Sequence, residues 1–217
     1  MPRHALVIGS QIEGRTGAEH DAGRMRALLV ELGFEVELRV GGDATRAGIL
    51  DGYDALIARV TGDAAAAIYY SGHGLYSIDS AGALGPVQSI APIDLRAGSD
   101  EDFRGITAWE LAIKLAQLTA VTRNVTVMLD CCHATQMTRG MPGDPVARAL
   151  PHPVRMGFAT HLRALEQRYG HVPVDPIGNP FAVRVVACGQ HEPAFEHTNA
   201  AGLRVGMFSE ALLDVLR

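Results

Sequence analysis

Two short stretches of the sequence carry residues that could work together as a nucleophile and a base. "YYSGHG" (69–74) places His73 between two glycines after an apolar run, and "DCCHA" (130–134) places Cys131 and Cys132 after another. An imidazole within reach of a thiol can take its proton and later protonate a leaving group, and the thiolate is the reactive form of cysteine. A cysteine that ends a buried strand is more often inert packing, so neither stretch is informative alone. Together they suggest a Cys/His active site.

The elements that must position this pair are short apolar runs alternating with segments of helical periodicity. We predict strands over 5–10, 34–40, 64–70, 125–132 and 181–189, and helices over 22–34, 44–60, 107–118, 156–170 and 207–216. Such alternation predicts an α/β fold with a mostly parallel sheet covered by helices on both faces. Ligands of such sheets bind beyond the carboxyl ends of the strands, where His73 and Cys132 both fall.

Composition narrows the class of protein. The 217 residues carry a net charge of −5, and 47% are hydrophobic, which is typical of a globular chain that we expect to form one domain over 1–217. The negative charge and the lack of a basic stripe argue against nucleic acid as a partner, and no apolar run is long enough for a membrane span. Adjacent cysteines do not form a disulfide framework, so we expect reduced thiols and a cytoplasmic protein.

The two motifs in combination resemble the caspase-like cysteine peptidases, specifically the metacaspase branch. The stretches "ALVIGS", "APIDL", "VVACGQHEPAFE" and "GMFSEALLDVL" are similar to further blocks of that family, in its order. The resemblance implies a caspase-like sandwich around a sheet of about six strands. The glutamine–alanine–cysteine signature of animal caspases is absent.

The resemblance also implies roles for individual residues. Cys132 matches the nucleophile of a cysteine endopeptidase, and His73 matches its general acid/base. The backbone N–H groups of Gly74 and Cys132 match the donors that hold the oxyanion of the tetrahedral intermediate. Cys131 is read as strand packing, the alternative being a second nucleophile. Ala134 and Thr135 stand where the family usually has serine and glycine, which departs from its pattern around the nucleophile.

Asp21 and Asp130 match acids with which metacaspases bind the side chain before the cut. Two carboxylates can hold a guanidinium by bidentate, charge-assisted bonds, so the resemblance implies cleavage of proteins or peptides after arginine or lysine. Without the resemblance, Asp21 would be read as an acid favouring a helix N-terminus, and Asp130 as a paired structural acid.

The stretch from 135 to 180 lies where the family carries an activation or processing loop. It contains Arg139, Arg148 and Arg155, which we take as candidate self-cleavage sites, the alternative being an ordinary surface connection around one helix. No cofactor is required by this interpretation. Calcium is a candidate activator through "SDED" (99–102), although a solvated acidic loop is the simpler interpretation, and an upstream activator is a candidate partner.

Three other interpretations stay open. A catalytically idle caspase-like domain could serve as an adaptor, although a scaffold needs neither catalytic residue. Metal binding through both cysteines, His133 and His73 is opposed by the absence of the spaced pairs typical of zinc sites. A thiol-redox protein is opposed by the lack of the usual two-residue gap between its cysteines.

Overall fold

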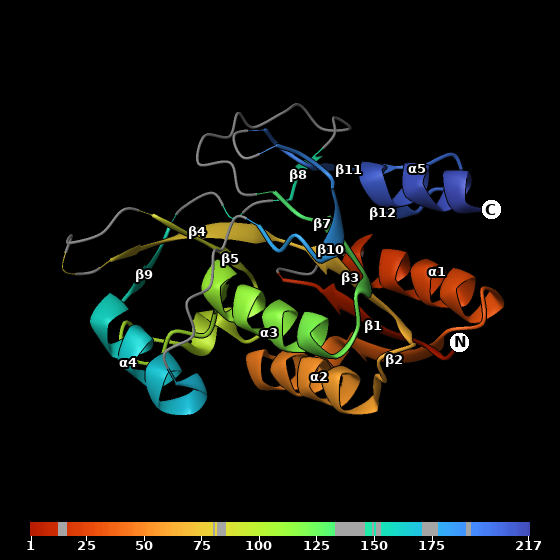
Figure 1. Ribbon diagram of the computed structural model, residues 1–217. Helices are drawn as coiled ribbons and strands as arrows, with labels where there is room; N and C mark the ends of the chain where they lie inside the picture. The colour runs from red at the N-terminus through yellow and green to blue at the C-terminus, as the bar shows by residue number, and fades with distance from the viewer. Residues whose placement is uncertain are drawn as a thin grey trace.

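Five parallel strands form the central sheet of the computed structural model (Figure 1), which describes residues 1–12, 17–79, 81, 86–132, 146–148, 150, 153–170, 178–189 and 192–217. The order across the sheet is β10-β7-β3-β1-β2, and every neighbouring pair is parallel. The strands are β1 (Arg3–Ser10), β2 (Glu35–Val40), β3 (Ala65–Gly72), β7 (Asn124–Asp130) and β10 (Ala182–Val186). The predicted parallel α/β sheet is confirmed, with five strands where the resemblance implied about six.

Helices cover both faces of this sheet, as predicted (Figure 1). On one face lie α1 (Gly17–Glu31) and α5 (Met207–Leu216), and on the other lie α2 (Arg46–Arg59) and α3 (Ala108–Val121). The remaining described helix, α4 (Phe158–Tyr169), lies beyond the sheet. Thr107 caps α3: its side chain accepts from the N–H of Glu110, whose carboxylate accepts from the N–H of Thr107.

Burial on both faces explains why the strands read as unbroken apolar runs. Ile68 and Tyr70 of β3 pack into the cluster on the α2/α3 side, whereas Ala67 and Tyr69 pack into the cluster on the α1/α5 side. Because successive side chains of a strand point to opposite faces, a strand buried on both sides has no polar alternation. No helix in the described ranges is long and apolar enough to cross a bilayer.

Two small sheets lie beside the central one, and neither was predicted. The first has the order β6-β5-β4-β9, with β4 (Gly74–Asp79), β5 (Val87–Ile90), β6 (Ile106–Thr107) and β9 (Val154–Met156). The second has the order β12-β11-β8, with β8 (Val146–Ala147), β11 (Phe195–Thr198) and β12 (Arg204–Gly206). Single 3-10 turns, η1 (Gly41–Asp43) and η2 (Leu95–Ala97), complete the elements. Strands of two to six residues carry too little periodicity to separate them from loops.

Candidate active site

The register of two neighbouring strands brings His73 and Cys132 to the same level of the fold. Ser71 of β3 pairs with Asp130 of β7, and each predicted catalytic residue lies two positions further along the chain, just past the end of its strand. Both residues are buried. Beside them, the backbones of Gly74 and Cys132 are in direct contact: a Cβ on Gly74 would lie 1.9 Å from the carbonyl oxygen of Cys132. Only glycine allows this approach.

The N–H groups of Gly74 and Cys132 converge on one oxygen atom. Both donate to the carbonyl oxygen of Arg148, at N···O distances of 3.0 and 3.2 Å. Two preorganised backbone donors aimed at one carbonyl are the arrangement that stabilises an oxyanion in acyl transfer. The two predicted donors therefore lie together, and a carbonyl group of the same chain lies between them.

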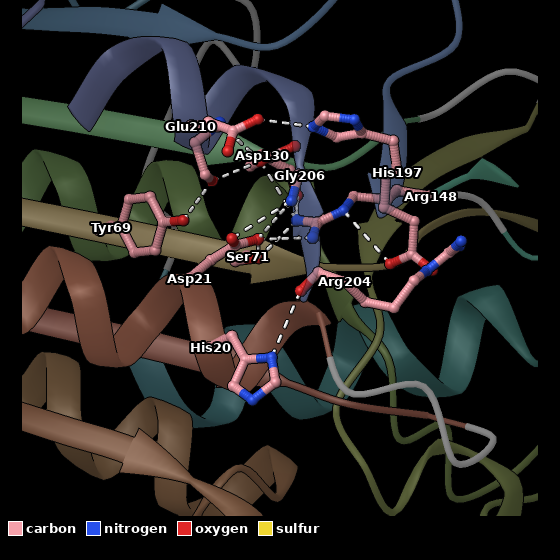
Figure 2. Close-up of polar contacts among 12 residues, drawn as sticks. His20, Asp21, Tyr69, Ser71, Asp130, Arg148, His197, Arg204, Gly206 and Glu210 are labelled. Carbon is pink, nitrogen blue, oxygen red and sulfur yellow. Dashed lines mark hydrogen bonds and ion pairs between the residues drawn. The ribbon is translucent and has the colours of Figure 1, made fainter. Parts of the chain in front are cut away.

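The side chain of Arg148 is enclosed by the two predicted acids (Figure 2). Its Nη2 atom lies 2.5 Å from Asp21 Oδ2, and its Nη1 atom lies 3.2 Å from Asp130 Oδ2. Nη1 also donates to the hydroxyl of Ser71. All three ionic side chains are at most 1% exposed. The two predicted acids therefore lie together, around an arginine that belongs to the chain itself.

Neighbouring groups hold the two carboxylates in place. Asp21 lies beyond the first turn of α1, and so not at the helix N-terminus that the alternative interpretation expected. Its carboxylate accepts from the N–H of Gly206 at 3.0 Å. Asp130 Oδ2 accepts from the N–H and the hydroxyl of Ser209, at 3.1 and 2.5 Å. Each acid is thus oriented by the last strand and helix of the chain, β12 and α5 (Figure 2).

Glu196 is a third carboxylate of the pocket, and the sequence did not identify it. Its Oε2 atom lies 3.7 Å from Arg148 Nε, and its Oε1 atom accepts from Arg204 at 2.8 Å. Glu196 is buried within β11, a strand too short to predict, and it belongs to no catalytic motif. Its signal in the sequence was limited to the quoted block "VVACGQHEPAFE", which ends on this residue.

Two glycines leave the space that the guanidinium fills. A Cβ on Gly206 would lie 2.0 Å from Asp130 Oδ2 and 2.8 Å from Arg148 Cζ. A Cβ on Gly17, where α1 begins, would lie 3.0 Å from Glu196 Oε2 and 3.2 Å from Arg148 Nη2. The dimensions of the pocket therefore depend on the absence of side chains at both positions.

Burial dominates the electrostatics of this pocket. Desolvation raises the pKa of Asp21 to about 6, although the charge of Arg148 acts in the opposite direction and that of Asp130 adds to the increase. Desolvation likewise raises the pKa of Asp130, against the lowering effect of Arg148. Burial alone would lower the pKa of Arg148, but Asp130 and Asp21 outweigh it and raise that pKa, which keeps the guanidinium charged.

The backbone before Arg148 is bound as a strand, and Leu150 beyond it is also hydrogen-bonded to the body of the protein. Ala147 and Val146 of β8 pair antiparallel with Phe195 and Glu196 of β11, and the N–H of Arg148 donates to the carbonyl of Ala194 at 2.8 Å. Further on, the N–H of Leu150 donates to the carbonyl of Gly74 at 3.0 Å. Addition of a strand to a sheet edge is a common way for a protein to bind an extended peptide.

Of the other two candidate cleavage sites, Arg155 is exposed on β9, and Arg139 lies outside the described residues. The stretch 135–180, expected to carry a processing loop, includes β8, β9 and α4.

The remaining sequence candidates lie apart from this pocket. Cys131 is buried in the apolar cluster beside α2 and α3, and burial raises its thiol pKa, which fits strand packing. Asp102 of the acidic stretch 99–102 pairs with Arg104 at 3.0 Å. Among the described residues, no group of three or more His, Cys, Asp or Glu side chains could hold a metal ion, and His133 lies outside them.

Comparison with known proteins identifies the architecture. The model of the caspase domain matches residues 2–217. No curated protein matches the sequence. Among solved structures, the crystal structure of protein GSU0716 from Geobacter sulfurreducens is similar with a TM-score of 0.68 and 20% sequence identity, covering 99% of this chain and 80% of that one. At that identity the likeness concerns the fold alone.

Proposed function

The chain belongs to the caspase-domain family, and from this premise we propose that it is a cysteine endopeptidase that cleaves after arginine. Cys132 is the proposed nucleophile, and His73 is the proposed general acid/base. The acids Asp21 and Asp130 are proposed to bind the arginine side chain, and lysine is the weaker alternative because it offers no bidentate fork. An acidic pocket of this kind favours the metacaspase branch over the animal caspases.

In the proposed reaction, His73 takes the proton of the Cys132 thiol, and the thiolate attacks the carbonyl carbon after which the chain is cut. The N–H groups of Gly74 and Cys132 hold the oxygen as it becomes negative. The C–N bond then breaks, and the proton on His73 passes to the departing amine. Water hydrolyses the resulting thioester, which releases the arginine carboxylate and restores the thiol.

The observation that carries this proposal is the position of Arg148. Its carbonyl oxygen accepts from both proposed oxyanion donors, while its guanidinium is bound by both proposed specificity acids. One arginine thus meets the carbonyl site and the side-chain site together, as an arginine before a scissile bond must. We therefore propose that the bond between Arg148 and Ala149 is the first substrate, so that the chain processes itself.

The test compares purified wild-type chain with Cys132→Ala and with the matched control Cys131→Ala, which removes the neighbouring thiol. We expect the wild type and Cys131→Ala to be cut, with a new amino terminus reading Ala-Leu-Pro, and Cys132→Ala to stay intact. After cutting, reporter peptides ending in arginine, lysine or aspartate should be cleaved in that order of preference, with aspartate untouched.

Two results would contradict the proposal. An undivided wild-type chain that is folded but inactive on all three reporters, with calcium and with a chelator, would favour an idle adaptor domain. Cleavage after aspartate would leave a peptidase but exclude the proposed roles of Asp21 and Asp130.

A further inference from the structure

The residue two positions after Arg148 also contacts the body of the protein. The side chain of Leu150 packs against a buried apolar cluster beneath β4, which we call the β4 cluster and which includes Ile12, Leu75, Leu95, Phe103 and Phe158. An apolar side chain gains free energy on leaving water for such a surface. The contact therefore favours the bound position of the segment that follows the proposed cut.

The backbone fixes where this side chain lies relative to the proposed scissile bond. Gly74 donates its N–H to the carbonyl of Arg148 and accepts at its own carbonyl from the N–H of Leu150, both at 3.0 Å. One residue thus sets the register on both sides of the bond. A peptide bound in this register must place its second residue after the cut over the β4 cluster.

We propose that the β4 cluster is a subsite for an apolar side chain at the second position after the cut. This inference rests on the proposed function, because it requires the bond after Arg148 to be the bond that reacts. The substrates it favours are extended segments in which an arginine is followed, two residues later, by leucine or a residue of similar shape. Apolar contacts of this size change kcat/KM by on the order of tenfold.

Val154 provides a matched control, because it separates recognition from simple anchoring of the chain. Its side chain packs against the same cluster, but it lies in β9, where it pairs with Ser77 of β4, four residues beyond Leu150. Truncating Val154 weakens the attachment of this segment without touching the position two residues after the cut.

The first experiment measures the rate at which the chain cuts itself. We expect Leu150→Asp to slow self-cleavage by on the order of tenfold, Leu150→Met to keep most of the rate, and Val154→Ala to match the wild type. Thermal unfolding of each variant checks that the fold is kept. Equal rates for Leu150→Asp and wild type would overturn the proposal, as would equal slowing by Leu150→Asp and Val154→Ala.

The second experiment uses peptides and the cut form of Leu150→Asp, whose own segment no longer competes for the subsite. Quenched peptides Val-Ala-Arg-Ala-Leu and Val-Ala-Arg-Ala-Asp are compared with a reporter that ends at arginine. Preference for leucine over aspartate of about tenfold supports the subsite. Equal cleavage of both peptides, with the reporter cut normally, overturns the subsite and leaves the proposed function intact. A Leu150→Asp chain that neither cuts itself nor cuts the reporter overturns both.

Discussion

The backbone nitrogen of Cys132 lies 3.2 Å from the carbonyl oxygen of Arg148, although 16 positions separate the two residues in the sequence. This hydrogen bond joins the proposed nucleophile to the group that it would attack. The guanidinium of the same arginine is bound by Asp21 and Asp130, so both ends of one residue are fixed.

Replacing Arg148 should slow self-cleavage according to how well the new side chain fills the pocket. Arg148→Lys keeps one charge but loses the fork and should slow cutting by on the order of tenfold, whereas Arg148→Gln should slow it by about a hundredfold or more, because two buried carboxylates lose their counter-charge. Gel analysis of the intact chain over time measures the rate. Arg155→Gln, an exposed arginine on β9, serves as the control, and equal effects at the two positions would contradict the assignment.

Adding one methyl group at Gly206 should block the pocket. Because its Cβ would meet Asp130 Oδ2 at 2.0 Å and Arg148 Cζ at 2.8 Å, Gly206→Ala must displace one of them, and we expect activity on an arginine reporter to fall by at least about a hundredfold. Gly23→Ala in α1 is the control, since nothing beyond its chain neighbours and the backbone of its own helix lies within 4 Å of its Cβ position. A folded Gly206→Ala chain with full activity would refute the binding of the arginine side chain beside Gly206.

Glu196 should distinguish arginine from lysine. Its carboxylate faces Nε of the guanidinium, a nitrogen that lysine lacks. Asp130 instead faces the end of the side chain, which carries a positive charge in arginine and in lysine alike. We expect Glu196→Gln to lower kcat/KM for an arginine reporter by about tenfold and to change the lysine value less. Asp130→Asn should lower both values. An unchanged arginine-to-lysine ratio in Glu196→Gln would exclude this role.

Binding of arginine-like ligands should weaken as the pH falls toward about 6, because that is the pKa of Asp21 with a guanidinium in the pocket, and the empty pocket takes up its proton at a higher pH. The stability of the fold changes with pH in the opposite direction. Because the folded state raises the pKa of Asp21, this carboxyl contributes most to the free energy of unfolding at a pH below its ordinary pKa, and the contribution is lost as the pH rises to about 6. Calorimetry of agmatine binding to the Cys132→Ala, Arg148→Ala double variant measures the first effect. Since the Arg148 charge lowers the pKa of Asp21, the emptied pocket should bind more protons and release one on binding the ligand. Affinity independent of pH between 5 and 8 would contradict this account.

The sequence predicted the central sheet because its strands are buried on both faces. Ile68 and Tyr70 pack toward one face and Tyr69 toward the other, so β3 is an unbroken apolar run from Ala65 to Tyr70 before Ser71 and Gly72 end it. The site at the carboxyl ends of β3 and β7 followed from the same pattern. The acids Asp21 and Asp130 came from the resemblance, since isolated aspartates have no periodicity.

The remaining parts of the site depend on contacts that sequence patterns do not encode. Glu196 lies on β11 and Gly206 ends β12, and such short strands become recognisable only when they pair. Arg148 looked equivalent to Arg139 and Arg155 in the sequence, because all three lie in the same stretch. What the structure adds for Arg148 is tertiary: β8 pairs with β11, and the side chain that follows β8 lies between the acids.

The ligand in this pocket is covalently joined to the protein that binds it, and this governs kinetics. A tethered group acts at an effective concentration on the order of millimolar. A free peptide must therefore compete with the Arg148 segment, whose effective concentration does not fall when the protein is diluted. Cutting should therefore be unimolecular, with a half-time independent of protein concentration, and it should resist added inhibitors far better than later turnover does. The rate of cutting would then be set by the chain's own active site, and cutting would begin when the chain folds rather than when it meets a partner.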